Sequence, residues 1–275
     1  MPEGTLIFNA DDFGWTDGHN QAVQRAHLEG VLNRASILAI GPAFYQAVEI
    51  AKNLPDLSVG VHLALNEGAP LLSPDRVGAL VNSTGAFWDT PADLVRIWLG
   101  GKLNTARVLP EWRTQLERAL DAGLKVSHLD SHKHVHMLPP LLETIIHLAK
   151  EYGISYVRLP LENPFRTPFR LSAPALWALA CLARQRLLRA GLHFADRFIG
   201  FGTSGKMSLS YLEQAVRGRG TGTTEIMVHP AVLTPAVQDL IRRYPVMAEY
   251  HFEQELEALI ALKSRLTPQG SRYAS

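Results

Sequence analysis

The chain has 275 residues, of which 47% are hydrophobic and 19% are charged, and its formal net charge is +1. This composition permits a large buried core and excludes an intrinsically disordered protein. The balanced charge gives no electrostatic reason to expect a nucleic-acid partner.

The chain has one cysteine, Cys181, so no disulfide forms within it. With a start, Met-Pro-Glu-Gly, that lacks the features of a signal peptide, this favours a cytoplasmic protein. The apolar run at 173–183 is too short to cross a bilayer. We therefore expect a buried helix face there, with Cys181 in the core, and contact with a lipid surface as the alternative.

Short apolar runs alternate with longer helical patterns along the chain. Strands are predicted at or within residues 5–10, 36–40, 57–65, 125–130, 155–159, 196–202 and 225–229. Helices are predicted at residues 18–30, 42–54, 91–99, 111–123, 139–152, 174–191, 209–218, 235–243 and 249–266. The polar segment 268–275 is predicted to be a frayed tail.

The segment from residue 66 to residue 110 departs from this alternation. It has scattered Pro and Gly residues, a predicted turn at 82–85 and only one predicted helix. Long excursions in compact domains often cover a functional site. We predict an insertion that forms a lid or a substrate wall within one domain spanning residues 1–275.

About seven strands alternating with helices predict an α/β fold with a parallel sheet. Polar residues follow several strand runs, namely Asp11 and Asp12, His62, His132, Arg158 and His229. Functional side chains collect at the carboxyl ends of strands in α/β barrels. We predict an irregular TIM-like (β/α) barrel. An open doubly wound sheet is the alternative, although its glycine-rich dinucleotide turn is absent after the first strand.

Residues 127–136 read Ser-His-Leu-Asp-Ser-His-Lys-His-Val-His and hold four of the 11 histidines. Clustered imidazoles are typical of metal ligands and proton carriers. Alternate side chains of an extended backbone share a face. A straight strand would therefore bring together His132, His134 and His136, and also His128 and Asp130. The alternative is a polar loop that happens to be rich in histidine.

Two adjacent carboxylates end the first predicted strand, in Asn-Ala-Asp11-Asp12-Phe-Gly. Carboxylates at the end of an apolar strand are costly unless they are paired or bind a metal. A bend there would turn both toward one site, where one binds a metal and the other accepts a proton. The alternative is that Asp12 caps the next helix, although Thr16 and Asp17 are also available.

Three single residues at other strand ends are further candidates. His62 in Gly-Val-His-Leu and His229 in Val-His-Pro-Ala are either functional imidazoles or core histidines with satisfied hydrogen bonds. Arg158 in Val-Arg-Leu-Pro is suited to hold a carboxylate through two hydrogen bonds, in a catalytic or a purely structural role.

Three motifs in this order resemble the YdjC-like carbohydrate deacetylases, which include chitooligosaccharide deacetylases: Asn-Ala-Asp-Asp-Phe-Gly, Gly-Val-His-Leu and His-Leu-Asp-Ser-His-Lys-His-Val-His-Met. The resemblance runs from Leu6 to about Pro230. Residues 196–207 and 225–231 also resemble the hopanoid-associated HpnK-like branch, whose substrates carry an acetylated sugar on a lipid. An apolar stretch 171–182 exposed near the site would favour such a substrate.

The resemblance implies a TIM-like barrel with a metal site formed by Asp12, His62 and His132, and with Asp11 as general base. The residues alone do not distinguish His132 from its neighbours at 134 and 136, whereas its place in the motif does. His128 is assigned as a neighbour of the metal ligands and not as a ligand itself. One carboxylate and two imidazoles favour Zn²⁺, with Mg²⁺ or Co²⁺ as alternatives.

The expected reaction is hydrolysis of the N-acetyl group of an amino sugar, in an oligosaccharide or a glycolipid, to an amine and acetate. A metal with three protein ligands keeps positions open for water and substrate. In this hypothesis Asp11 takes a proton from the attacking water and His229 protonates the leaving nitrogen. Arg158 orients Asp11.

Two other functions fit the same residues. A metal-dependent hydrolase of a phosphodiester would need phosphate-binding cations, for which Arg158 and Lys133 are the candidates. A non-catalytic carbohydrate-binding module would hold a structural metal through four protein ligands, so His134 or His136 on the metal would favour it. Sugar stacking or core packing is expected for three aromatic residues, Trp15, Phe87 and Trp88. The composition is also compatible with a homo-oligomer.

Overall fold

The computed structural model describes residues 4–165 and 171–266, so the predicted tail at 268–275 lies outside the described residues. Its seven strands form one parallel sheet in the order β5-β4-β3-β2-β1-β7-β6. The strands are β1 Leu6–Phe13, β2 Arg34–Ile37, β3 Ser58–Leu63, β4 His128–Ser131, β5 Tyr156–Val157, β6 Arg197–Ile199 and β7 Thr224–Val228.

The strand order is that of a barrel. Apart from β5 and β6, consecutive strands of the chain lie side by side, and the first strand, β1, also pairs with the last, β7. A doubly wound sheet would instead reverse its order near the middle. Between β5 and β6, which do not pair in the described chain, an isolated bridge joins Tyr156 to His193, just before β6. The predicted irregular barrel is therefore confirmed.

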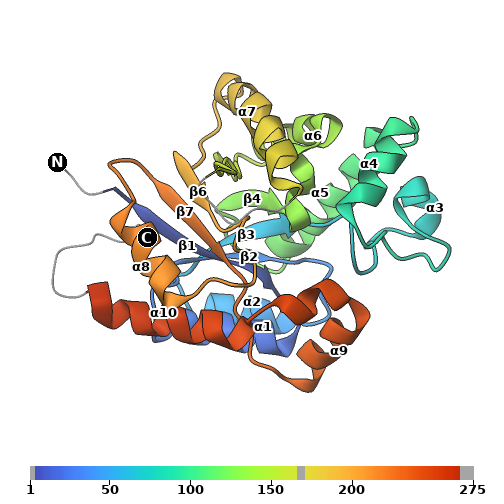
Figure 1. Ribbon diagram of the computed structural model, residues 1–275. Helices are drawn as coiled ribbons and strands as arrows, with labels where there is room; N and C mark the ends of the chain where they lie inside the picture. Colours follow the sequence, from blue (N-terminus) through green and yellow to red (C-terminus); the bar gives the residue numbers. More distant parts are fainter. Residues whose placement is uncertain (1–3, 166–170, 267–275) are drawn as a thin grey trace.

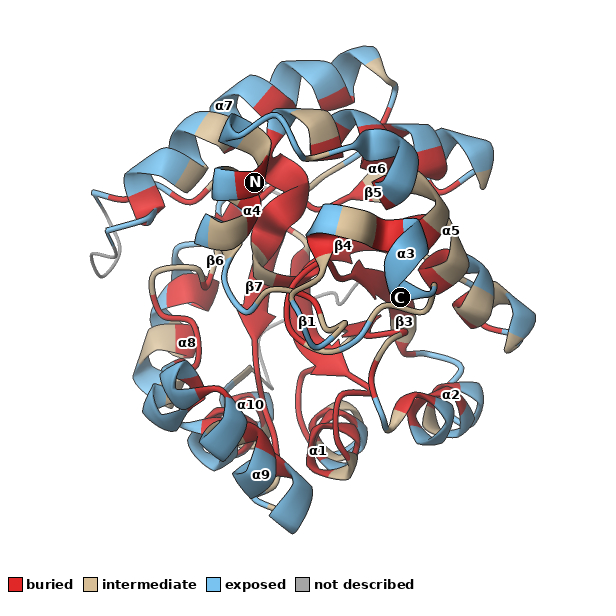
Figure 2. Cartoon of the chain, turned by 90° about the vertical axis from the view of Figure 1, so that its right-hand side faces the viewer, coloured by how far each residue is buried: buried red, intermediate tan, exposed pale blue. Residues whose placement is uncertain are grey.

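Helices surround the curled sheet, as Figure 2 shows with the buried strands at the centre. Helices α1, α2 and α10 lie on one side of the sheet, and α6 and α7 lie on the other (Figure 1). The larger helices are α1 Asp17–Leu28, α2 Phe44–Lys52, α4 Pro91–Leu99, α5 Thr105–Asp121, α6 Pro139–Glu151, α7 Ala173–Arg189, α8 Leu209–Arg217, α9 Pro235–Arg243 and α10 Phe252–Leu266. This cover explains the apolar strands, because a parallel sheet is buried on both faces.

Several predicted boundaries shift for local reasons. Helix α5 begins at Thr105 rather than at 111, because the Asn104 side chain caps it by accepting a hydrogen bond from the Ala106 backbone N–H. Pro110 lies inside that helix and does not start it. Strand β1 continues to Phe13, so both carboxylates of the acidic pair belong to it.

The insertion at 66–110 contains two short helical turns, α3 Pro74–Val77 and η1 Gly78–Leu80, before α4. The predicted turn is present, since the Gly85 N–H donates to the Asn82 carbonyl at 3.0 Å. Phe87 is buried, and the Trp88 indole N–H donates to the Ala79 carbonyl. Both aromatic residues therefore serve the packing of the insertion itself.

Helix α7 contradicts the predicted burial of the apolar run. Among its residues only Ala173, Ala180, Ala183 and Leu187 are buried, and Cys181 is exposed rather than in the core. Three alanines and Leu187 pack the helix on the molecule, whereas Trp177, Leu182 and Leu188 remain exposed. Among the described helices, none is long and apolar enough to cross a membrane.

Candidate metal centre

Asp11 and Asp12 line the same cavity because β1 bends at its carboxyl end. Its register with β2 shifts between Ala10 and Phe13, and Asp12 has a φ of 65°. Such a backbone is rare for a residue other than glycine, and strain of this kind concentrates at functional sites. Thr16 caps α1, so Asp12 is not needed as a cap.

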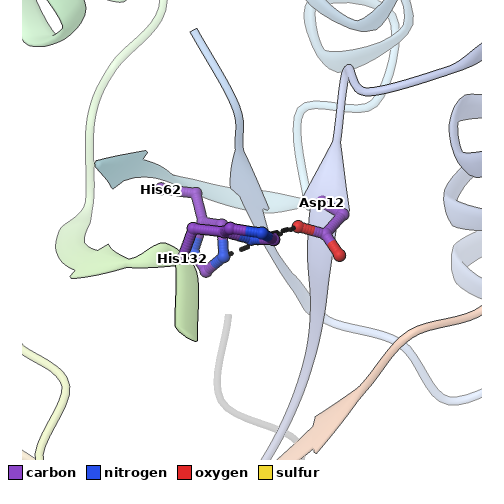
Figure 3. A group of neighbouring side chains, drawn as sticks. All are labelled: Asp12, His62 and His132. Atoms are coloured by element: carbon purple, nitrogen blue, oxygen red, sulfur yellow. Dashed lines mark ion pairs between the residues drawn. The ribbon is translucent and has the colours of Figure 1, made fainter. Parts of the chain in front are cut away.

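Asp12, His62 and His132 meet at the carboxyl ends of β1, β3 and β4 (Figure 3). Each offers one ligand atom, and these three atoms lie within 4.8 Å of one another. Asp12 Oδ1 is 2.9 Å from His132 Nδ1 and 3.7 Å from His62 Nε2. All three side chains are buried. The structure thus brings together the three residues that motif position singled out.

In each histidine of this group, the ring nitrogen that faces away from Asp12 lies beside another carboxylate. His62 Nδ1 lies 2.7 Å from Asp130 Oδ1, and His132 Nε2 lies 2.7 Å from Glu67 Oε2. Protons on those outer nitrogens would leave lone pairs on His62 Nε2 and His132 Nδ1, directed at the cluster. Carboxylates placed in this way orient histidine ligands of metals.

The donor set fits a divalent cation. Asp12 Oδ1 is buried and has no hydrogen-bond donor in the described chain, although His132 Nδ1 is close to it. A buried carboxylate oxygen without a donor is costly, and a cation held by Asp12, His62 and His132 would remove that cost. One carboxylate and two imidazoles suit Zn²⁺.

In the absence of a cation, a proton stabilises the same arrangement. Burial alone would lower the pKa of His132, but the nearby carboxylates of Asp12 and Glu67 raise it to about 9. Burial would raise the pKa of Asp12, yet the neighbouring His132 and His62 hold it well below its usual range. The site therefore favours a bound positive charge beside Asp12.

A second group of possible ligands, Asp11, His62 and Asp130, is less suitable. Asp130 already accepts a hydrogen bond from Ser36 Oγ at 2.8 Å and pairs with Arg158 at 2.7 Å. Asp11 is likewise occupied by Arg158. A cation in this group would have to displace those partners.

Arg158 is fully buried and contacts three carboxylates. Its two terminal nitrogens donate to Asp11 at 2.8 and 2.7 Å, and its Nε donates to Glu225 Oε1 at 2.6 Å. The third carboxylate is Asp130. Burial would lower the pKa of Arg158, but these three charges raise it well above its usual value. Arg158 therefore fixes Asp11 and links it to the carboxylate behind His62.

The three histidines after β4 do not project together, which corrects the prediction for an extended backbone. The chain from His132 to Met137 forms a 3₁₀ helix, η2, in which Lys133 and His134 have φ values of 53° and 55°. This change of direction leaves His132 alone at the cluster. Sequence alone gave no reason to expect a left-handed backbone at a lysine and a histidine.

His134 and His136 have other surroundings. The His134 ring packs against Phe198 and Phe201 at centroid distances of 5.6 and 5.7 Å. His136 Nδ1 lies 2.6 Å from Ser131 Oγ. In the described chain neither histidine belongs to a group that could hold a metal.

His128 and Asp130 share a face of β4, as predicted. Ser36 Oγ lies 3.1 Å from His128 Nε2 and donates to Asp130 Oδ2. Gly60 makes room for the imidazole, because a Cβ there would lie 2.3 Å from His128 Nδ1. His128 therefore supports Asp130 from behind and does not reach the metal ligands.

His229 lines the same cavity from the end of β7. Its Nδ1 is buried without a hydrogen-bond partner among the described residues, while its backbone N–H donates to Glu255 Oε2 at 2.6 Å. Burial lowers the pKa of His229, against the opposing effect of Asp11 and Asp12. It is thus a neutral imidazole with an unused polar atom.

The cavity has a volume of about 570 Å³, within the usual range for small-molecule sites. Residues from the segment 66–110 and from the beginning of α7 line part of it. The wall residues from these two parts are Asp89, Thr90, Pro91, Val95, Ser172, Ala175, Leu176 and Leu179. Trp15 is buried and packs edge-on against His132 at 5.0 Å, so it supports a ligand.

Sequence reasoning missed three carboxylates of this site, Glu67, Glu225 and Glu255. Each is buried, and each contacts a candidate site residue, but they come from a loop, a strand and a helix far apart in the chain. Glu225 immediately before an apolar strand run was the one visible signal, because a charge there needs a buried partner. Glu67 gave none.

Comparisons of the sequence with known proteins point to one family. The model of the family described as YdjC-like protein matches residues 5–265. A carbohydrate deacetylase of Vibrio cholerae is 38% identical over 237 residues, which cover 85% of this chain and 81% of that protein. A chitooligosaccharide deacetylase of Klebsiella pneumoniae is 27% identical over 274 residues, 99% of this chain and 98% of that protein.

A solved structure agrees along the whole chain. It is a protein of Enterococcus faecalis V583 described as a candidate for cellobiose-phosphate cleavage. The two chains are 26% identical, with a TM-score of 0.76, and the match covers 99% of this chain and 97% of that one. The family model and these relatives, together with the barrel and its buried Asp-His cluster, show that the chain belongs to the YdjC-like protein family.

Proposed function

We propose that this protein is a metal-dependent hydrolase that removes the N-acetyl group from an acetylated amino sugar and releases acetate. The observation that carries the proposal is one cavity that is lined both by the Asp12–His62–His132 group and by Asp11, which the buried Arg158 holds from behind. The names of the relatives, carbohydrate deacetylase and chitooligosaccharide deacetylase, support the choice of substrate class.

In this proposal Asp12 Oδ1, His62 Nε2 and His132 Nδ1 hold the metal, with Zn²⁺ first and Mg²⁺ or Co²⁺ as alternatives. A bound metal would activate water and polarise the acetyl carbonyl. Three protein ligands suit such a role, because catalytic sites keep positions open. Glu67 and Asp130 keep the two imidazoles in the required tautomers.

Asp11 is the proposed general base. It accepts a proton from the water as the water oxygen bonds to the acetyl carbon. Arg158 holds the Asp11 carboxylate through two hydrogen bonds, which fixes the direction in which that carboxylate can accept the proton.

His229 is the proposed acid. The C–N bond then breaks, and an amide nitrogen cannot leave unless it is protonated. Because His229 is neutral before the reaction, it must first take up a proton, and the proton that Asp11 removes from the water is the proposed source. Its lowered pKa then makes the protonated imidazole a stronger acid toward the nitrogen. The products are acetate and a free amine.

We further propose that residues 66–110 act as a substrate wall or lid, since Asp89, Thr90, Pro91 and Val95 line the cavity. A glycolipid substrate, as in the hopanoid-associated HpnK-like branch, is the finer proposal. It is supported by Leu171 and Leu182 on the outside of the cavity wall, where they are 90% and 70% exposed.

The alternative functions have less support. A structural metal would need a fourth protein ligand, and in the described chain His134 and His136 are engaged elsewhere. A phosphodiesterase would need available cations, but Arg158 contacts three carboxylates and Lys133 contacts Glu67. Arg243 is a further cation that lines the cavity and that sequence reasoning missed.

A substrate panel tests the proposal. Purified metal-loaded protein is given N-acetylglucosamine oligomers, an N-acetylglucosaminyl lipid and a chromogenic phosphodiester. We expect acetate release from at least one of the acetylated sugars and no cleavage of the phosphodiester. Cleavage of the phosphodiester alone, or binding of the sugars without any acetate, would overturn the proposal in favour of the corresponding alternative.

A further inference from the structure

The outer surface of α7 carries large exposed apolar residues as far as Leu182. Leu171, just before the helix, and Leu182 are 90% and 70% exposed, and Trp177 is 38% exposed. In Figure 2 most of α7 is coloured as exposed, in contrast to the buried strands. Large apolar side chains that gather on one surface mark an interaction site more often than chance exposure.

After Leu182 the same helix is rich in arginine. Arg184 and Arg189 have no ion-pair partner among the described residues, whereas Arg186 pairs with Glu143 at 2.7 Å. Residues 171–195 contain three arginines and no Asp or Glu. Apolar and cationic residues are therefore adjacent on one surface, with no acidic residue of this segment to oppose an anionic partner.

This surface continues into the cavity. Ala175, Leu176 and Leu179 of α7 line the cavity that holds Asp12 and His132. The helix therefore has one face toward the candidate metal centre and another toward the outside. A molecule held against the exposed apolar residues of α7 would therefore lie next to the cavity wall.

We propose that α7 is a docking surface for an anionic lipid bilayer. Its exposed apolar residues, as far as Leu182, enter the interface between headgroups and acyl chains, and its arginines contact lipid phosphates, as in helices that lie in the plane of a membrane. This orientation directs the cavity toward the lipid surface. The inference extends the proposed function, on which it rests for the idea of a lipid-linked substrate, but docking itself does not depend on catalysis.

Charge favours lipid over a second copy of the chain as the occupant. Two copies that met through α7 would bring unpaired arginines of both helices into one interface, where like charges repel. An anionic bilayer supplies both negative charge for the arginines and an apolar interior for the exposed leucines.

Cys181 allows a direct test, because it is the chain's only cysteine and is exposed on α7. An environment-sensitive dye on Cys181 of the full-length protein is titrated with two kinds of vesicle. One is phosphatidylcholine, and the other is phosphatidylcholine mixed two to one with phosphatidylglycerol. We expect a blue shift and co-sedimentation with the anionic vesicles, both weakened by salt.

Matched variants locate the surface. Leu171→Ser with Leu182→Ser should reduce the affinity for anionic vesicles by roughly tenfold, while Leu28→Ser, at an exposed leucine of α1, should leave it unchanged. The dye is also moved to α1 by Cys181→Ser with Leu28→Cys, where it should report no change in its surroundings.

Three results would overturn the docking proposal. They are no response to either vesicle, an equal response to both, and a shift that depends on protein concentration without vesicles, which would indicate self-association. Acetate release from a soluble acetylated sugar is measured on the same samples. A failure of docking with acetate release intact is thereby distinguished from a failure of the proposed function.

Discussion

Arg158 holds Asp11 through two hydrogen bonds of 2.8 and 2.7 Å, while the next residue, Asp12, keeps a buried oxygen without a donor. Two neighbouring carboxylates thus have opposite surroundings. One is fixed by a buried cation, and the other is available to a metal. This difference is the physical basis for assigning them different roles.

Asp11→Asn should separate these roles. The amide cannot accept the proton, so we expect kcat to fall by about 10²–10⁴-fold, while metal content stays that of the unmodified protein. Asp12→Asn is the matched control, since it should lose metal. Both are measured by acetate release and elemental analysis. Loss of metal in Asp11→Asn would show that the two carboxylates have been assigned the wrong way round.

Arg158 should be important for stability as well as activity. Arg158→Met leaves three carboxylates buried without their cation, so we expect the free energy of unfolding to fall by about 3–5 kcal/mol. Arg158→Lys keeps the charge but cannot form the paired hydrogen bonds, so it should lose mainly kcat. Urea unfolding and steady-state kinetics measure the two effects. Equal stability of both variants and the unmodified protein would contradict the role of this network.

Glu67 should tune the metal through His132. Glu67→Gln replaces a charged acceptor at His132 Nε2 with a neutral amide, so we expect metal affinity to fall by about 10–100-fold. Lys133→Met is the control, because it removes another partner of Glu67 and leaves the bond to His132 intact. Competition with a chelator gives both affinities. An unchanged affinity in Glu67→Gln would exclude this role.

Metal binding should strengthen as pH rises. A proton and the metal compete for His132 Nδ1, and the pKa of His132 without metal is raised to about 9. Below that pH the proton must leave before the metal binds, so each lower pH unit should weaken binding by about tenfold. Chelator competition between about pH 6 and pH 9 measures the slope. Affinity independent of pH over this range would mean that His132 is not protonated in the free site.

Much of the fold followed from local sequence patterns. The alternation of strands and helices predicted the barrel, because short apolar runs flanked by turn signals have few other solutions. The bend that turns Asp11 and Asp12 into one cavity was also predicted, from the cost of leaving two carboxylates unpaired. The N-cap Thr16 was one of two candidates beside it.

The incorrect or missing predictions have a common cause. They concern features that depend on contacts between residues far apart in the sequence. His134 has a left-handed backbone, which is uncommon outside glycine, and its ring packs against Phe198 and Phe201 far along the chain. Cys181 was expected in the core because its neighbours are apolar, yet composition does not say which face of a helix finds a partner. Glu67 becomes part of the site only through its contact with His132.

Metal-dependent release of acetate tests the central claim most directly. The protein is stripped with a chelator, then given Zn²⁺, Mg²⁺ or Co²⁺ singly, and acetate is measured with an N-acetylglucosaminyl substrate. The account predicts no release from the stripped protein, recovery with at least one cation, and no recovery in Asp11→Asn. Acetate release that persists after stripping, or that survives in Asp11→Asn with its metal bound, would contradict it.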